Sequence, residues 1–271
     1  MNETTAPMVE QDAKYITKLA RKQLSRIGFV YFAGTVLLLA LELSLAMLFE
    51  FGNPDGDYDS SVLIFFNLFL RFILGYPVML CLIHLVKKGK SIPQKKMRAG
   101  SIFVAFFMAY AMAMITNIIG ILLTSIINAF HNGVNTTDLQ DTMLALPSAW
   151  LILFVCVGAP VFEELIFRKA LVDRAIYCGE GIAIAMSGVM FGLFHGNLNQ
   201  FVYAAALGAF FAFIYVRTGK IRYTMILHAM VNSMATIGTL LLKIFSEGTT
   251  GYLEGTEALT SVSSLDLYSL L

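Results

Sequence analysis

Charged residues are scarce in this sequence, where lysine, arginine, aspartate and glutamate together make up 14% of the 271 residues. A soluble domain usually carries about a quarter charged residues. Hydrophobic residues account for 58% of the chain, and they gather into runs close to the ~20 residues that cross a bilayer as a helix. We therefore expect an all-α, polytopic helical membrane protein, with about seven transmembrane helices enclosing a polar cavity.

Cysteine is also rare, and the three cysteines are too scattered for a disulfide framework or a zinc knuckle. The net charge of +1 gives no reason to expect a nucleic-acid partner. The first 27 residues are polar and contain no short apolar core before a cleavage site, so they do not resemble a signal peptide. No internal repeat is evident, which argues against an inverted-repeat transporter.

The hydrophobic pattern divides the chain into four segments. Residues 1–27 form an amphipathic N-terminal segment, 28–142 hold the first three transmembrane helices, 143–245 hold the remaining helices, and 246–271 form a polar tail that we expect to be poorly ordered. The individual spans are predicted at 28–51, 62–86, 101–127, from 148 onward, 181–196, 199–216 and 223–245.

Lysine and arginine alternate along the chain in a way that predicts its orientation. They occur in residues 1–27, 87–98, 168–174 and 217–222, and they are absent from the alternating loops at 52–61, 128–147 and 197–199 and from the tail after Lys243. Because cytoplasmic loops carry the excess of basic residues, the N-terminus is predicted to be cytoplasmic and the C-terminus outside. No eukaryotic targeting feature is present, so we expect a bacterial plasma membrane.

The fourth span carries three ionisable residues, Glu163, Glu164 and Arg168. An ionisable residue inside a membrane costs several kcal/mol and is a candidate functional residue. Glu164 and Arg168 are four apart and can pair on one helix face, whereas Glu163 lies about 100° away. If the helix continues to Arg174, Glu163 lies roughly 16 Å deep. We therefore predict a buried Glu164–Arg168 pair that leaves Glu163 for chemistry.

Later spans add two histidines and an asparagine, namely His195, His228 and Asn232. Each alone is more often a hydrogen-bonded core residue, but together with Glu163 they predict a polar cavity. A carboxylate or imidazole can take a proton from water, while an imidazole and an amide can stabilise an oxyanion. Glu163, His195 and His228 could instead hold a metal with an open position for water. Outside this group, Glu42 and Arg71 are predicted to pair between the first two spans.

These residues form three motifs in order: Glu163-Glu164-x-x-x-Arg168, Phe191-x-x-x-His195 and His228-x-x-x-Asn232. The set resembles the signature of the type II CAAX prenyl protease and bacteriocin-processing (CPBP, Abi) family of intramembrane proteases, over residues 143–245. The resemblance implies an all-helical fold with a cavity that opens to the cytosol. It also implies that Glu163 and His195 activate the hydrolytic water, and that His228 and Asn232 form the oxyanion pocket.

By the same resemblance Glu164 and Arg168 are supporting residues, and the substrate is a membrane-associated or lipidated peptide or protein. Zinc dependence is unsettled in the family, so Zn²⁺ bound by Glu163, His195 and His228 stays open. Two other functions also stay open. One is a non-proteolytic membrane scaffold or bacteriocin-immunity protein, and the other is a proton-coupled carrier that uses Glu163 and the histidines as a relay.

Overall fold

The computed structural model describes residues 5–52, 60–89, 91–130 and 147–253, and the elements in these ranges are helical. Six helical segments are long and apolar enough to cross a membrane. The shorter apolar helix α9 (Glu180–Phe194) brings the described total to seven, in agreement with the all-α polytopic fold that the sequence predicts. These lengths and compositions are those of an integral membrane protein.

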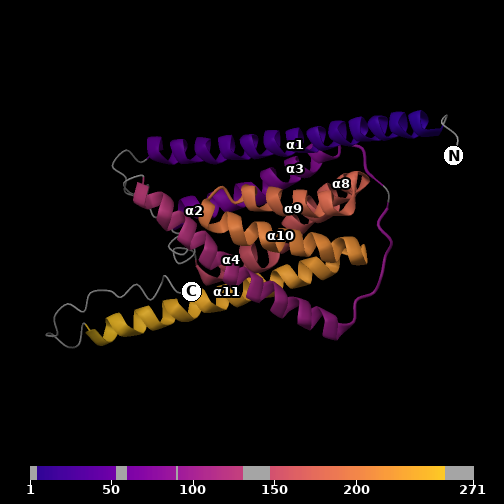
Figure 1. Cartoon of the computed structure of the whole chain (residues 1–271). Helices are drawn as coiled ribbons and strands as arrows, with labels where there is room; N and C mark the ends of the chain where they lie inside the picture. Colours follow the sequence, from indigo (N-terminus) through magenta and orange to yellow (C-terminus); the bar gives the residue numbers. More distant parts are fainter. Residues whose placement is uncertain (1–4, 53–59, 90, 131–146, 254–271) are drawn as a thin grey trace.

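The helices form one bundle in which α1 (Thr5–Gly52) and α11 (Ile221–Leu253) run along opposite sides (Figure 1). Between them lie α9 and α10 (Leu198–Thr218), and α4 (Ala99–Phe130) packs against α10. The second span consists of α2 (Ser60–Leu70), η1 (Arg71–Gly75) and α3 (Tyr76–Ile83). The fourth span consists of α6 (Ser148–Leu151), η2 (Ile152–Gly158), α7 (Ala159–Glu164), η3 (Leu165–Val172), α8 (Asp173–Ala175) and η4 (Ile176–Cys178).

Two helices continue past predicted segment boundaries. The N-terminal segment does not form a separate helix, because α1 continues without a break for 48 residues. No proline lies between Pro7 and Pro54, and a helical glycine costs only about 1 kcal/mol, so nothing stops the helix near residue 27. Helix α11 likewise continues past residue 245 to Leu253, since extending a formed helix is far easier than nucleating one. The rest of the predicted tail, 254–271, lies outside the described residues.

The second and fourth spans each contain a π-helical segment just before a proline. In η1 the Tyr76 amide donates to the Arg71 carbonyl five residues back, and Pro77 follows. In η2 the Ala159 amide donates to the Phe154 carbonyl, and Pro160 follows. Proline has no N–H and crowds the preceding turn, so the turn before it widens. These two wide turns lie directly before the polar residues of the candidate site.

Helices α9 and α10 approach closely through glycines. A Cβ built on Gly188 would lie 2.7 Å from the Ala205 carbonyl oxygen, and one built on Gly192 would lie 2.7 Å from that of Phe201. Small residues let transmembrane backbones come this near. The contact fixes the height of α9 against α10, and with it the position of His195 at the end of α9.

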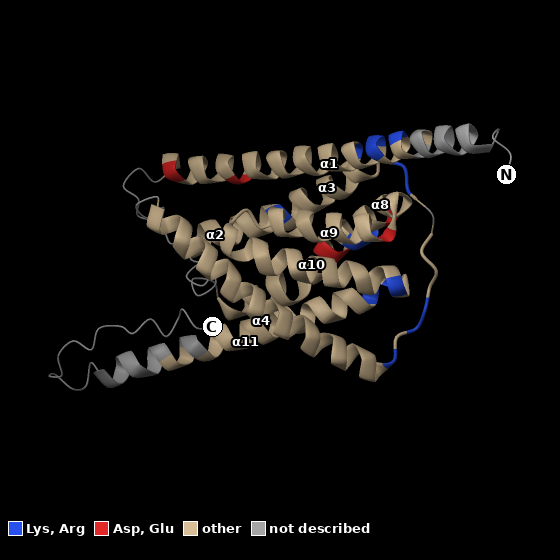
Figure 2. Ribbon diagram, viewed as in Figure 1, with Lys and Arg blue, Asp and Glu red and all other residues tan. Residues whose placement is uncertain are grey.

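Most of the described lysines and arginines gather at one end of the bundle, here called the basic end (Figure 2). This end holds the N-terminal half of α1, the connection from α3 to α4 and the turn between α10 and α11. The connection is tied down by backbone hydrogen bonds from Gly89 N to the Asp173 carbonyl and from Lys95 N to the Thr218 carbonyl, both 2.8 Å. It therefore links the fourth span to α10 at the basic end.

Candidate active site

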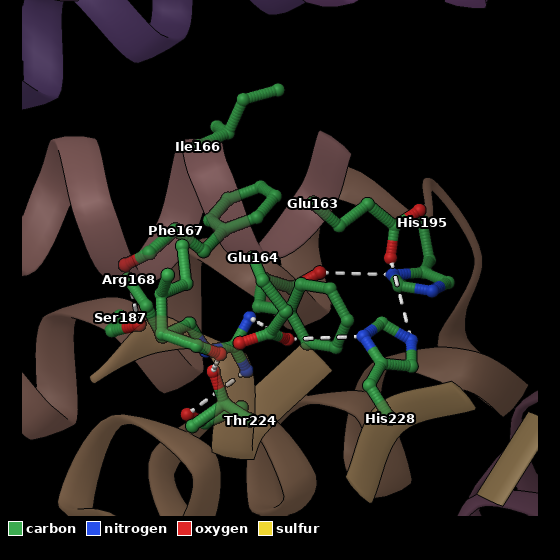
Figure 3. Close-up of polar contacts among 12 residues, drawn as sticks. Glu163, Glu164, Ile166, Phe167, Arg168, Ser187, His195, Thr224 and His228 are labelled. Carbon is green, nitrogen blue, oxygen red and sulfur yellow. Dashed lines mark hydrogen bonds and ion pairs between the residues drawn. The ribbon is translucent and has the colours of Figure 1, made fainter. Parts of the chain in front are cut away.

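The predicted ion pair in the fourth span is confirmed. Arg168 Nη1 lies 3.1 Å from Glu164 Oε1, and neither side chain is exposed. Glu163 is also buried, with 7% of its surface exposed. A buried cation needs a partner of opposite charge, so Glu164 is committed to Arg168 while Glu163 faces another way (Figure 3).

Arg168 also joins the fourth span to α9 and α10. Its Nη2 donates to the Gly208 carbonyl over 3.2 Å. Its guanidinium lies over the rings of Phe191 and Phe211, at 4.6 and 5.5 Å from their centroids. A planar guanidinium suits both contacts, which a lysine could not reproduce. Arg168 is therefore a structural centre of the bundle.

His228 on α11 contacts both glutamates. Its Nδ1 lies 3.0 Å from Glu164 Oε1, and its Nε2 lies 3.7 Å from Glu163 Oε2 (Figure 3). A carboxylate only accepts, so Nδ1 carries a proton and the tautomer of the ring is set by Glu164. The sequence predicted that Glu164 would pair with Arg168, and the structure adds His228 as its second partner.

His195 lies at the end of α9, on the same side as Glu163 (Figure 3). Its Nδ1 lies 2.9 Å from the Phe191 carbonyl oxygen, which can only accept a hydrogen bond. The proton of the neutral ring is therefore on Nδ1, and Nε2 keeps its lone pair. That nitrogen is chemically able to act as a base.

Asn232, one turn beyond His228, donates from Nδ2 to the Val155 carbonyl over 2.9 Å. This carbonyl lies in η2, where the Ala159 amide is already bonded to Phe154. The next donor in sequence would be residue 160, but proline has no N–H. Asn232 thus satisfies an acceptor that Pro160 leaves unpaired, and it keeps one amide hydrogen for another partner.

One polar contact of Glu163 was missed by the sequence reasoning. The hydroxyl of Tyr76, on the second span, donates to Glu163 Oε1 over 3.0 Å and is buried. The sequence shows no motif of the family in the first three spans, so it gives no reason to expect a contact with Glu163 there. The sequence feature that could have revealed this contact is a tyrosine directly before Pro77 within an apolar run. A proline there indicates a widened helical turn, and the tyrosine places a polar group in it.

The predicted pair between the first two spans is present. Arg71 donates to Glu42 Oε1 from Nε at 2.9 Å and from Nη2 at 2.6 Å. Two donors on one carboxylate oxygen hold the pair within the membrane segment. The pair neutralises a cation near the glutamate site without using Glu163.

The metal set predicted from sequence has suitable donor types, since Zn²⁺ binds imidazole nitrogen and carboxylate oxygen. In the part of the chain that the structure describes, however, no three histidine, cysteine, aspartate or glutamate side chains lie close enough together to hold a metal ion. Glu163, His195 and His228 as placed here do not fit a zinc ion. The sequence leaves zinc dependence open, and metal analysis of the purified protein decides it.

Two comparisons with known proteins support the motif resemblance. Residues 145–234 match the model of the "Type II CAAX prenyl endopeptidase Rce1-like" family. The chain is 26% identical over 223 residues to the "Putative membrane peptidase YdiL" of Bacillus subtilis, covering 77% of this chain and 87% of that protein. It is 24% identical over 219 residues to the "Membrane-embedded CAAX protease MroQ" of Staphylococcus aureus, covering 76% and 88%.

No solved structure matches the chain. The matches to both relatives are too long to be confined to residues 143–245, so the similarity also includes part of the first three spans. The family model itself covers every motif residue that the sequence singled out. The resemblance that the three motifs indicate is therefore confirmed: residues 145–234 match the Rce1-like, type II CAAX prenyl endopeptidase family model, and the chain is similar over most of its length to a membrane peptidase and a membrane-embedded CAAX protease.

Proposed function

We propose that this protein is an intramembrane endopeptidase that hydrolyses a peptide bond in a membrane-associated or lipidated peptide. The observation that carries the proposal is the buried contact between Glu163 Oε2 and His228 Nε2 at 3.7 Å, inside helices that match a protease family. A separation longer than a direct hydrogen bond leaves the carboxylate oxygen able to bind a water. Hydrolysis needs such a water held by a base.

Glu163 and His195 are the groups that activate the water. Glu163 Oε2 and the unprotonated Nε2 of His195 are both acceptors, so either can take a proton as the water attacks the carbonyl carbon. The surrounding helices exclude bulk water, which strengthens each of these electrostatic interactions. The proton then passes to the leaving amine, as hydrolysis of an amide requires.

His228 and Asn232 stabilise the oxyanion of the tetrahedral intermediate. The Glu164 carboxylate on Nδ1 orients the His228 ring so that Nε2 faces Glu163, and a proton on Nε2 is donated to the oxyanion. Asn232 donates with the amide hydrogen that Val155 does not use. Such donors act where charge develops in the transition state. Glu164 and Arg168 position His228 rather than contact substrate.

The basic end is the cytoplasmic side in this proposal, with the N-terminus in the cytoplasm and the C-terminus outside. The distribution of lysine and arginine in Figure 2 supports it, because α1 begins and α10 ends at the same basic end. Lysines at an inner membrane surface also suit an anionic leaflet. Substrates are therefore expected to approach from the cytoplasmic side.

The test is cleavage by the purified full-length protein in liposomes. The probes are two quenched fluorescent peptides of one sequence, one with a farnesylated C-A-A-X end and one without the lipid, and products are identified by mass spectrometry. Glu163→Ala and His195→Ala are each expected to lower the cleavage rate about 10²- to 10⁴-fold. Glu180→Gln, at a half-exposed ion pair with Arg217, is the control. Undiminished cleavage by Glu163→Ala contradicts the proposal.

A non-proteolytic scaffold or bacteriocin-immunity protein is the second candidate. It is favoured by one observation, that His228 Nδ1 and Asn232 Nδ2 are bonded to groups of the same chain. A purely structural network would look the same at these atoms. In that case Glu163→Ala would keep the cellular phenotype, while substitutions in the first three spans would lose it.

A further inference from the structure

Tyr76 lies outside the three motifs yet contacts the residue on which the proposed reaction depends. It is the first residue of α3, it is 2% exposed, and its hydroxyl donates to Glu163 Oε1 over 3.0 Å. A buried tyrosine hydroxyl needs a partner, and here that partner is a carboxylate from another span. The second span is thus connected directly to the glutamate of the fourth.

The ring of Tyr76 lies between the helices that carry the motifs. Its centroid is 5.5 Å from that of Phe162 and 5.9 Å from that of Phe194. These two phenylalanines directly precede Glu163 and His195 in the sequence. The ring is therefore held from both sides by the segments that present the acid and the base.

The backbone at Tyr76 supports the same placement. The residue ends the wide turn before Pro77, with its amide bonded to the Arg71 carbonyl. Arg71 is in turn paired with Glu42 at 2.6 Å. Because that cation is already neutralised, the donor that holds Glu163 Oε1 is the neutral hydroxyl of Tyr76 and not a second ion pair.

We propose that Tyr76 is a positioning residue for Glu163: its hydroxyl holds Oε1, so that Oε2 stays directed at His228 and at the water. The two oxygens of the carboxylate have different partners: Oε1 lies 3.0 Å from the Tyr76 hydroxyl, and Oε2 lies 3.7 Å from His228 Nε2. One oxygen is thus held in place while the other is left to act as the base. This inference rests on the proposed function. It adds a residue from the second span to a site otherwise built from the fourth, fifth and seventh.

The test compares Tyr76→Phe with Tyr31→Phe in the full-length protein in liposomes, with the farnesylated quenched peptide as probe. Tyr31 is a matched control because it is 1% exposed and its hydroxyl donates over 2.6 Å to the Ile166 carbonyl of the same fourth span. Both changes remove one buried hydroxyl and keep the ring. Both variants are assayed well below their unfolding temperatures, so that unfolding and lost turnover are separated.

Tyr76→Phe is expected to lower kcat about 10- to 100-fold with KM nearly unchanged, because a misplaced catalytic group slows the chemical step and not binding. Tyr31→Phe is expected to keep kcat within about twofold of wild type, since its hydroxyl contacts no reacting group. A wild-type kcat in Tyr76→Phe overturns the inference, as does an equal loss in Tyr31→Phe. Glu163→Gln distinguishes a failure of the Tyr76 inference from a failure of the proposed function. If Glu163→Gln cleaves the peptide at the wild-type rate, the proposed function itself fails.

Discussion

His228 Nδ1 and Arg168 Nη1 share one oxygen of Glu164, at 3.0 and 3.1 Å. A single buried carboxylate oxygen thus orients an imidazole of α11 and neutralises a guanidinium of the fourth span. The arrangement resembles the general pattern in which a buried acid fixes the tautomer of a catalytic histidine. It gives Glu164 a role distinct from that of Glu163, although the two are adjacent in sequence.

Glu164→Gln is predicted to destabilise the protein by about 3–5 kcal/mol, because it leaves the Arg168 charge buried without its partner. Heat- or denaturant-induced unfolding of the protein in detergent measures this loss. Glu180→Gln removes a half-exposed ion pair instead and should change stability by no more than about 1 kcal/mol. Equal stability of the two variants would show that Arg168 does not depend on Glu164.

Gly188→Ala and Gly192→Ala are each predicted to destabilise by about 1–3 kcal/mol and to reduce cleavage, since a Cβ 2.7 Å from a facing carbonyl forces α9 away from α10. His195 moves with α9, so activity falls with stability. Gly181→Ala in the same helix is the control, because no atom lies within 4 Å of its Cβ position. If all three alanines behave alike, the close helix contact does not position the histidine.

The link between Asn232 and Pro160 can be tested by a double-mutant cycle. Asn232→Leu leaves the Val155 carbonyl without its donor and should cost about 1–3 kcal/mol. Pro160→Ala restores an N–H five residues after Val155, so the loss should be smaller in that background. Asn67→Leu is the control, since Asn67 bonds to Leu63 of its own helix. Strict additivity of the Asn232 and Pro160 changes would contradict the link.

The sequence predicted the helical class, the seven apolar helical segments and the Glu164–Arg168 pair, because hydrophobic run length and four-residue spacing carry that information. It could not predict the partners of Glu163. Spacing along one helix says nothing about Tyr76 on another span, and the wide turns at Pro77 and Pro160 shift the helix faces. Hydropathy likewise could not locate where α1 begins or α11 ends.

Metal dependence has a separate test, and the geometry predicts its outcome. Since the described acidic, histidine and cysteine side chains form no three-residue cluster able to hold a metal, cleavage should survive dialysis against 1,10-phenanthroline. Metal analysis of the purified protein should find no stoichiometric zinc. The opposite result would be one equivalent of zinc whose removal abolishes cleavage and whose return restores it. That result would show that Glu163, His195 and His228 close around a metal in solution.

The proposed function depends on activation of water by the Glu163 carboxylate, in a buried site made by the fourth, fifth and seventh spans. The most direct measurement is the single-turnover rate at which Glu163→Gln cleaves the farnesylated peptide in liposomes, compared with Glu180→Gln. Glu163→Gln is expected to cleave about 10²-fold or more slowly than wild type, and Glu180→Gln is expected to cleave at the wild-type rate. A Glu163→Gln rate equal to that of wild type would contradict it.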